Sequence, residues 1–326
     1  MRAAWYESNG PARDVLQVGE MLTPSAGPGE VRVRLHASGI NPYDVKIREG
    51  LRQKMAFSKI VPHCDGAGVI DDIGEGVSPA RFGERVWVFN AQWQRANGTA
   101  AEWIVLPQAF VAPLPENTSF AEGACLGIPA MTAHRAVFSN GLVTGLTVVV
   151  TGGAGGVGFY AIQLAKWGGA RVIATVSGEA KAEIATAAGA DHVLNYRTED
   201  VVERLAVLTS GKGVDRIIEV DFAANLKTSG RALKGNGVIA TYASMADPEP
   251  KLPFYPLMFG NVNIQLVAVF LIPYAARRQA VSDITRCCDK GILKHRTKRM
   301  PLDRIVEAQE AVESGDEVDR VILDMD

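Results

Sequence analysis

Apolar and polar residues follow two different patterns along the chain, which separate an N-terminal part from the rest. Before residue 120, residues 31–40 alternate with a period of two, as a half-buried strand does, and short apolar runs at 66–77 and 83–89 lie between glycines. A helical pattern occurs there only around residues 42–50. The N-terminal part is therefore predicted to be rich in β-strands.

From residue 123 onward, strand-like runs alternate with amphipathic helical runs. The pairs are 146–152 with 159–169, 171–176 with 179–189, 192–196 with 198–209, and 214–220 with 224–234, followed by a strand at 237–243. This alternation predicts βαβ units and a doubly wound parallel sheet, and hence the α/β class. An apolar run at 264–272 ends it, and two helices (275–290 and 302–314) and a closing strand (320–325) are predicted after that run.

Three glycines between the first of these strands and its helix form the pattern Gly153-x-Gly155-x-x-Gly158. In a strand-to-helix context this pattern predicts a dinucleotide site, because glycines permit the tight turn, the approach of backbone to a pyrophosphate, and close packing of helix on strand. N–H groups at the helix N-terminus would face the phosphates. The alternative is that the glycines only make a tight turn. We expect a Rossmann domain over residues 123–268, inserted into a second domain formed by residues 1–122 and 269–326.

The end of the second strand predicts which dinucleotide binds. NAD-binding folds place an acidic residue about 20 positions after the glycines to hold the ribose hydroxyls, whereas this strand ends at Ser177-Gly178 and the first carboxylate is that of Glu179. Lys181 and Tyr196 are nearby, and together with Ser177 they suit a 2′-phosphate, so we predict NADPH. Taken singly, Lys181 also suits a solvated helix face and Tyr196 an exposed strand end.

Charge and cysteine content narrow the setting of the protein. The 34 basic and 36 acidic residues give a formal net charge of −2, which argues against nucleic acid or an anionic membrane as the main partner. Four cysteines are too few for a disulfide scaffold, and the adjacent pair Cys287-Cys288 favours free thiols in a reducing compartment. The most apolar stretch, 266–276, is too short to span a bilayer, and Glu7 lies where a signal peptide would need apolar residues. We expect a cytoplasmic protein.

Four stretches resemble the zinc-independent quinone oxidoreductases, the zeta-crystallin-like family of the medium-chain dehydrogenase/reductases. They are GINPYDVKIREG, IPAMTAHRAV, GGAGGVGFYAIQLAK and ATVSGEAKAEIATAAGADHVLNYRTED, and the likeness extends over nearly the whole chain. The resemblance implies a GroES-like β-rich catalytic domain in addition to the Rossmann domain, NADPH as the cofactor, quinones as substrates, and a homodimer or homotetramer. The apolar run at 264–272 suits an edge strand that pairs across a two-fold axis, or simply a buried strand.

The resemblance also implies which residues meet the cofactor. Residues 154–157 would hold the pyrophosphate, Asn225 and residues 242–245 would line the path from adenosine to nicotinamide, and residues 268–270 would meet the carboxamide. The full expected set is Asn41, Ala154, Gly155, Gly156, Val157, Ser177, Lys181, Tyr196, Asn225, Tyr242, Ala243, Ser244, Met245, Ala268, Val269, Phe270 and Arg320, the last as a basic group that reaches phosphate.

The segment that begins at Asn41 carries the candidate catalytic residues. Asn41, Pro42 and Asp44 predict a helix start, because asparagine caps helices, proline suits the first helical position and aspartate the first turn. In the relatives the matching asparagine also faces the cleft. As hydrogen-bond donors, Asn41, Tyr43 and Lys46 would stabilise the oxygen that gains charge during reduction.

Two departures from the superfamily bear on the chemistry. Its zinc-binding members carry metal ligands at positions that match Asn41, Cys64, Asp65 and Ile128, and because two ligand-type side chains cannot form a three-ligand site, no metal is predicted. Cys64 is expected to be a small buried residue, or else a reactive thiol. The family's usual tyrosines are replaced by Lys46 and Arg52, which either give the pocket a positive charge or are solvated surface groups.

The sequence thus predicts an NADPH-dependent, zinc-independent quinone oxidoreductase. Two alternatives stay open. One is an NADPH-dependent reductase of the C=C bond of an enone or enoyl substrate, and the other is a non-enzymatic crystallin-like or RNA-binding role in which NADPH only stabilises the protein. A short-chain dehydrogenase is disfavoured, because no Tyr-x-x-x-Lys pair occurs in the sequence.

Overall fold

The protein divides into two compact units in a computed structural model that describes residues 1–51 and 54–325. Unit 1 comprises Met1–Ile128 and Val281–Asp326, and unit 2 comprises Pro129–Ala280. The Rossmann domain expected from the sequence, residues 123–268, overlaps unit 2 over most of its length, and its bounds stay a prediction. A π-helical turn, η3 (Leu126–Ala130), and the helix α10 (Tyr274–Asp289) carry the chain from one unit into the other.

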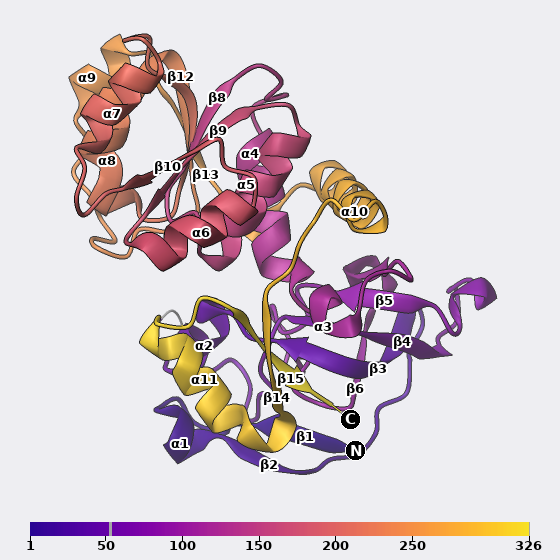
Figure 1. The fold of residues 1–326 in the computed structure, drawn as a ribbon. Helices are drawn as coiled ribbons and strands as arrows, with labels where there is room; N and C mark the ends of the chain where they lie inside the picture. Colours follow the sequence, from indigo (N-terminus) through magenta and orange to yellow (C-terminus); the bar gives the residue numbers. More distant parts are fainter. Residues whose placement is uncertain (52–53, 326) are drawn as a thin grey trace. The chain divides into compact units, whose positions relative to one another are not determined.

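Unit 2 is a parallel sheet with helices on both faces. In chain order it contains α4 (Met131–Phe138), β8 (Thr147–Val150), α5 (Gly156–Trp167), β9 (Arg171–Val176), α6 (Glu179–Ala187), β10 (His192–Asn195), α7 (Val201–Leu208), β11 (Val214–Glu219), α8 (Phe222–Ala232), β12 (Leu233–Thr241), α9 (Phe254–Phe259), β13 (Asn263–Leu266) and the 3₁₀ turn η4 (Val269–Leu271). The six strands lie in the order β10-β9-β8-β11-β12-β13, all parallel, which is the order of doubly wound dinucleotide-binding folds. Figure 1 shows α5 and α6 on one face of this sheet and α7 and α8 on the other.

Burial explains why these runs form strands and helices. The β-branched residues of the central strands are covered on both sides, as parallel sheets require, and Val149, Ile173 and Ile217 pack in one cluster with Leu205 of α7. The predicted α/β class and doubly wound sheet are confirmed. The apolar run at 264–272 is different from a single long strand, because only its first residues belong to β13 at the sheet edge, and Leu266 is 71% exposed.

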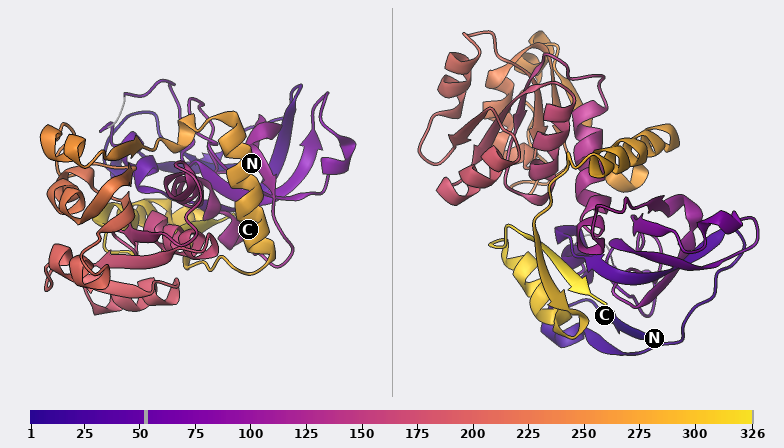
Figure 2. Two further views of the ribbon diagram at one scale, coloured as in Figure 1. Left: turned by 90° about the horizontal axis from the view of Figure 1, so that it is seen from above. Right: turned by 45° about the vertical axis from the view of Figure 1, so that its right-hand side comes forward.

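Unit 1 is rich in strands, and both ends of the chain contribute to it. Its elements are β1 (Arg2–Trp5), α1 (Ala12–Val15), β2 (Gln17–Glu20), β3 (Glu30–Gly39), α2 (Pro42–Arg48), β4 (Asp65–Ile73), η1 (Pro79–Arg81), β5 (Arg85–Val88), β6 (Trp103–Pro107), η2 (Gln108–Phe110), β7 (Val111–Pro113), α3 (Phe120–Gly123), β14 (Thr297–Pro301), η5 (Leu302–Arg304), α11 (Ile305–Ser314) and β15 (Arg320–Asp324). The larger sheet has the order β14-β15-β3-β4-β5-β7, and β6 also pairs with β3. Because β15 pairs with β3, residues more than 280 positions apart share one sheet and one core, and both chain ends lie in this unit (Figure 2).

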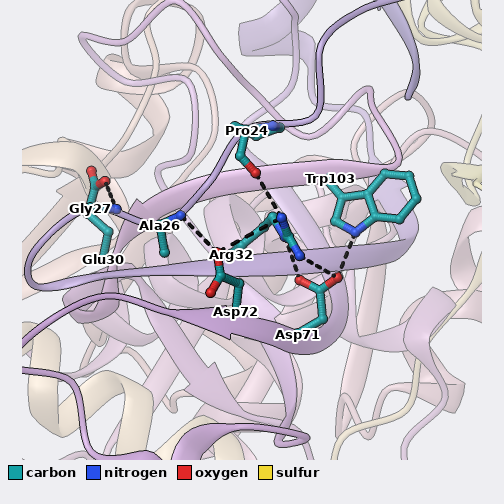
Figure 3. A network of polar contacts seen from close by, with 8 residues as sticks. All are labelled: Pro24, Ala26, Gly27, Glu30, Arg32, Asp71, Asp72 and Trp103. Carbon is teal, nitrogen blue, oxygen red and sulfur yellow. Dashed lines mark hydrogen bonds and ion pairs between the residues drawn. The ribbon is translucent and has the colours of Figure 1, made fainter.

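A partly buried polar network fastens the loop before β3 to this sheet (Figure 3). Arg32 Nε donates to Asp71 Oδ1 at 2.8 Å, and Arg32 Nη1 donates to the Pro24 carbonyl at 3.0 Å. Trp103 Nε1 donates to the other oxygen of Asp71 at 2.8 Å, so one carboxylate joins β3, β4 and β6. These contacts join three strands of the sheet, and the charges of Arg32 and Asp71 pair with each other.

Within the part of the chain that the structure describes, no helix combines the length and the apolar character needed to cross a membrane.

Candidate active site and dinucleotide-binding edge

The expected cofactor residues of unit 2 all follow the carboxyl ends of its parallel strands. Residues 154–157 follow β8, Ser177 and Lys181 follow β9, Tyr196 follows β10, Asn225 follows β11, residues 242–245 follow β12, and residues 268–270 follow β13. Since these ends share one edge of the sheet, the fold gathers the whole set there, around the point between β8 and β11 where the strand order reverses. Ligands of open α/β sheets bind at such a reversal.

The glycines of the loop after β8 have separate structural reasons. A Cβ on Gly158 would lie 2.2 Å from the carbonyl oxygen of Gly152, and one on Gly153 would lie 2.8 Å from the Cβ of Ala174, so both glycines permit close packing. Gly152 has φ +63°, a left-handed conformation that favours glycine. The turn therefore depends on Gly152, one residue before the motif recognised in the sequence, and a glycine directly after a β-branched strand was the signal for it.

Gly155 has the properties needed for approach of a phosphate. It is the N-cap of α5 with φ −75°, is exposed, and a Cβ there would meet no described atom closer than the Gly152 oxygen at 3.3 Å. No side chain of a described residue caps the first turn of α5, so its N–H groups are available to an anion.

The end of the sheet formed by β9 and β10 holds the residues expected to select the dinucleotide. The Tyr196 N–H donates to the Val176 carbonyl at 3.1 Å, which places Tyr196 alongside the end of β9 and next to Ser177. Tyr196 is 52% exposed, and Lys181 lies in α6, whose first residue is the exposed Glu179. Tyr196 and Ser177 thus lie next to each other at the ends of neighbouring strands, and Lys181 is in the first turn of the helix that follows β9.

Sequence reasoning missed Glu219, the last residue of β11. Its side chain is fully buried at this same edge and accepts hydrogen bonds from Thr151 Oγ1 and Asn225 Nδ2, both at 2.8 Å. A carboxylate directly after an apolar strand, in the run RIIEV, was the only signal in the sequence.

In unit 1, Asn41 is the N-cap of the helix α2, as predicted, and it forms a capping box with Asp44. Its backbone N–H donates to Asp44 Oδ2 at 2.7 Å, which closes the first turn. Its amide Nδ2 donates to Asp65 Oδ2 at 2.8 Å, and its Oδ1 accepts from Arg320 Nη2 at 2.6 Å. Asn41 is only 1% exposed, so its amide is engaged inside unit 1. Arg320, expected at phosphate, contacts Asn41, and the cofactor roles of both residues stay predictions.

Two carboxyl groups are buried in this cluster. Asp65 Oδ2 also accepts from the Ile128 N–H at 2.8 Å, and a Cβ on Gly127 would lie 2.0 Å from Asp65 Oδ1, so a glycine is required beside it. Burial, reinforced by the charge of Asp44, raises the pKa of Asp65 to about 7, and burial raises the pKa of Asp44 to about 6. Near neutral pH Asp65 is therefore partly protonated, and the Arg320 guanidinium is the positive charge of the cluster.

The remaining candidate catalytic residues lie on α2. The ring of Tyr43 is 6.4 Å from the ring of Trp93, and burial raises the pKa of the Tyr43 phenol further above neutral pH. Lys46 is partly buried in the last turn of α2. Arg52 lies outside the described residues. Cys64 is fully buried, and burial raises the pKa of its thiol well above the usual value, which matches a packing role better than a nucleophilic one.

A doubly wound sheet joined to a β-rich unit completed by the C-terminal strands is the architecture of the medium-chain dehydrogenase/reductases. A family model described as zinc-binding dehydrogenase matches residues 156–285, and one described as alcohol dehydrogenase GroES-like domain matches residues 27–116. The quinone oxidoreductase of Rattus norvegicus is 33% identical over 71% of this chain and 69% of its own length, and that of Homo sapiens is 29% identical over 95% and 93%.

Solved structures agree over almost the entire chain. One described as an NAD-dependent alcohol dehydrogenase superposes with a TM-score of 0.90 at 31% identity, covering 99% of each chain. A mycobacterial quinone oxidoreductase superposes with a TM-score of 0.87 at 27% identity, again over 99% of each chain. A mycobacterial protein in complex with NADPH has a TM-score of 0.87 at 26% identity, over 99% of this chain and all of its own. The chain belongs to the quinone oxidoreductase family of the medium-chain dehydrogenase/reductases, and it is an oxidoreductase.

The zinc ion in the name of one family model does not fit the residues present. The Asn41 amide is occupied by Asp65 and Arg320, which leaves Cys64 and the buried carboxyls near the matching positions. Among the described residues, no group of three or more histidine, cysteine or acidic side chains is arranged to hold a metal ion.

Proposed function

We propose that this oxidoreductase reduces quinones with NADPH and uses no zinc. The observation that carries the proposal is the corner formed by Ser177, Lys181 and Tyr196, where the strand end has a lysine, a phenol and a hydroxyl in place of an acidic residue. The rat and human relatives are named quinone oxidoreductases, which supports a quinone as the acceptor. The mycobacterial relative in complex with NADPH supports NADPH as the cofactor.

Each part of the chain has a role in this reaction. The N–H groups at the start of α5 bind the pyrophosphate, and Lys181 with Tyr196 and Ser177 binds the 2′-phosphate. NADPH supplies a hydride when bound. A quinone is already a strong oxidant, so the protein has to position it, exclude water and donate a hydrogen bond to the oxygen that gains charge. The Tyr43 phenol, which is protonated at neutral pH, is the donor we assign, and the adjacent Trp93 ring suits a planar substrate.

Steady-state oxidation of NADPH tests the proposal, with a benzoquinone, a phenanthrenequinone and a simple enone as acceptors, NADH as the competing donor, and EDTA as the metal control. We expect quinone turnover that prefers NADPH and is insensitive to EDTA. Turnover of the enone to its saturated product without turnover of quinones would replace the proposal by the C=C reductase. Binding of NADPH without any turnover would favour the non-enzymatic role.

Charge reversal at Lys181 tests the cofactor preference. A hydrogen bond between charged groups contributes about 1.5–3 kcal/mol, so Lys181→Glu should weaken NADPH binding by at least about tenfold and leave NADH binding nearly unchanged. Lys212→Glu is the matched control. Lys212 is an exposed lysine just before β11, at the amino ends of the parallel strands, whereas the expected cofactor residues follow their carboxyl ends. Equal losses for NADPH and NADH would contradict the assignment.

We further propose that two copies associate through β13. This strand is the outermost strand of the sheet, and its Leu266 is 71% exposed. The helix α9 packs next to it and carries the exposed aromatic residues Phe254, Tyr255 and Phe259. An edge strand with apolar surroundings would otherwise promote aggregation. Leu266→Arg should convert a dimer or tetramer into a smaller species in sedimentation velocity, and a wild-type monomer would contradict the proposal.

The most basic stretch of the chain gives nucleic acid little to bind. Lys298 pairs with Glu317 at 2.6 Å, Arg299 with Asp324 at 2.9 Å, and Arg296 with Asp319 at 2.5 Å. Because acidic neighbours neutralise these residues, an RNA-binding role has weak electrostatic support.

A further inference from the structure

Glu219 is placed where a buried charge needs an explanation. It ends β11, one of the two strands that flank the reversal of strand order, and its side chain is inaccessible to solvent. Its carboxylate accepts four hydrogen bonds, from Thr151 Oγ1 (2.8 Å), the Asp221 N–H (2.9 Å), Asn225 Nδ2 (2.8 Å) and Ser229 Oγ (3.1 Å). Burying a carboxylate at the end of the sheet where phosphates are expected costs free energy, which its hydrogen bonds must offset, and this arrangement calls for a role at the site.

The hydrogen bonds determine how the Asn225 amide is oriented. Glu219 Oε1 receives the backbone N–H of Asp221, which can only donate, so this oxygen acts as an acceptor. Asn225 must therefore turn its NH₂ group toward Glu219, and its Oδ1 faces away. Burial raises the pKa of Glu219 above its usual value, and the four hydrogen-bond donors oppose this rise.

The same carboxylate fixes the strand end on the other side of the reversal. Thr151, which precedes the left-handed Gly152, donates to Glu219 and accepts from the Val220 N–H at 2.9 Å. Glu219 thus connects the beginning of the phosphate loop with the first turns of α8, where Asn225 is partly exposed.

We propose that Glu219 is a positioning residue of the dinucleotide site, which orients Asn225 so that its amide oxygen, and not its NH₂ group, is offered to the cofactor. Asn225 then recognises a donor, namely a ribose hydroxyl or the carboxamide NH₂ of the nicotinamide, and contributes nothing to phosphate binding. The inference rests on the proposed use of a nicotinamide dinucleotide, but it does not depend on which acceptor is reduced.

Removing the acceptor tests the orientation directly. In Glu219→Leu, Asn225 loses the oxygen that orients its amide, and in Asn225→Asp two carboxylates face each other, so each variant should weaken NADPH binding by about tenfold or more. Glu219→Gln is the conservative variant, because its amide oxygen can take the place of Oε1 and its NH₂ group can donate to Ser229 Oγ. Glu219→Gln should therefore bind NADPH more tightly than Glu219→Leu, as a fluorescence titration measures.

Asp215→Asn is the matched control. Asp215 lies at the opposite end of β11, accepts from the Thr147 N–H at 2.8 Å and pairs with Lys234. Its loss should lower the melting temperature without changing the dissociation constant of NADPH. A purely structural role of Glu219 predicts instead that Glu219→Leu lowers the melting temperature and leaves the dissociation constant of NADPH unchanged.

Three results would overturn the inference while leaving the proposed function intact. They are wild-type affinity in Glu219→Leu, a Glu219→Gln variant that binds no better than Glu219→Leu, or wild-type affinity in Asn225→Ala, which keeps Glu219 and serves if the other variants do not fold. If the wild-type protein binds neither NADPH nor NADH, the proposed function is wrong and the role of Glu219 falls with it.

Discussion

The glycines of the phosphate loop allow packing and ligand binding to be separated by two single substitutions. In Gly158→Ala, the new Cβ starts 2.2 Å from the Gly152 oxygen and 2.9 Å from its carbonyl carbon, where ordinary contacts begin at 3.4 Å. Both neighbours are backbone atoms, so the start of α5 must move away by about 1 Å. Overpacking of this kind costs about 1–3 kcal/mol. Gly158→Ala should therefore unfold several degrees below the wild type.

Gly155→Ala is the matched comparison. Its Cβ has 3.3 Å to the Gly152 oxygen, and its φ of −75° is ordinary for alanine. The smaller entropy of the unfolded chain offsets the loss of a good N-cap residue, so the free energy of unfolding should change by less than about 1 kcal/mol. The methyl group nevertheless projects from the exposed loop where the pyrophosphate is expected, and NADPH binding should weaken by about tenfold or more.

Thermal unfolding and a fluorescence titration with NADPH, measured for both variants and for the wild type, separate the effect on stability from the effect on affinity. Gly158→Ala should lose both stability and affinity, whereas Gly155→Ala should lose affinity alone. The reasoning is refuted if Gly158→Ala melts with the wild type, or if Gly155→Ala is destabilised as much as Gly158→Ala.

Three further predictions concern unit 1. Between pH 3.8, the ordinary pKa of the group, and about pH 7, Asp65 keeps a proton in the folded protein but loses it in the unfolded chain, so the free energy of unfolding should fall as pH rises through this range. Asp65→Asn should reduce the slope of the free energy of unfolding against pH, measured by urea titrations between about pH 4 and pH 8. An unchanged slope would contradict the assignment. Arg48, fully buried, donates to Gln309 at 2.8 Å and to Glu313 at 2.9 Å, so Arg48→Met should lower the free energy of unfolding by about 1–3 kcal/mol in guanidinium titrations, and a wild-type midpoint would show that these contacts contribute nothing. All four cysteines are buried, so a thiol reagent at neutral pH should label four thiols only after unfolding, and rapid labelling of the folded protein would mean that one of them is reactive.

Much of the architecture follows from local sequence. The period-two residues 31–40 correspond to β3, the helix start at Pro42 is observed, and the alternating runs after residue 123 correspond to the strands and helices of unit 2. These features are readable because the spacing of apolar residues and the presence of proline or glycine act on neighbouring residues. The gathering of the expected cofactor residues at one edge also follows, since carboxyl ends of parallel strands coincide.

The partners of individual polar groups were decided only by the tertiary structure. Asn41 is the helix cap that the sequence predicts, but its amide is also bound by Asp65 and by Arg320, which is 279 positions away. Glu219 reads as the end of a strand, yet its carboxylate connects Thr151, at the start of the glycine-rich loop after β8, with Asn225 of α8. A buried polar group must find a hydrogen-bond partner, and which segment supplies it depends on how the strands are ordered in the sheet. The sequence by itself therefore determined the elements and the glycine-rich turn after β8, and the long-range pairing of strands determined which partners each buried side chain has.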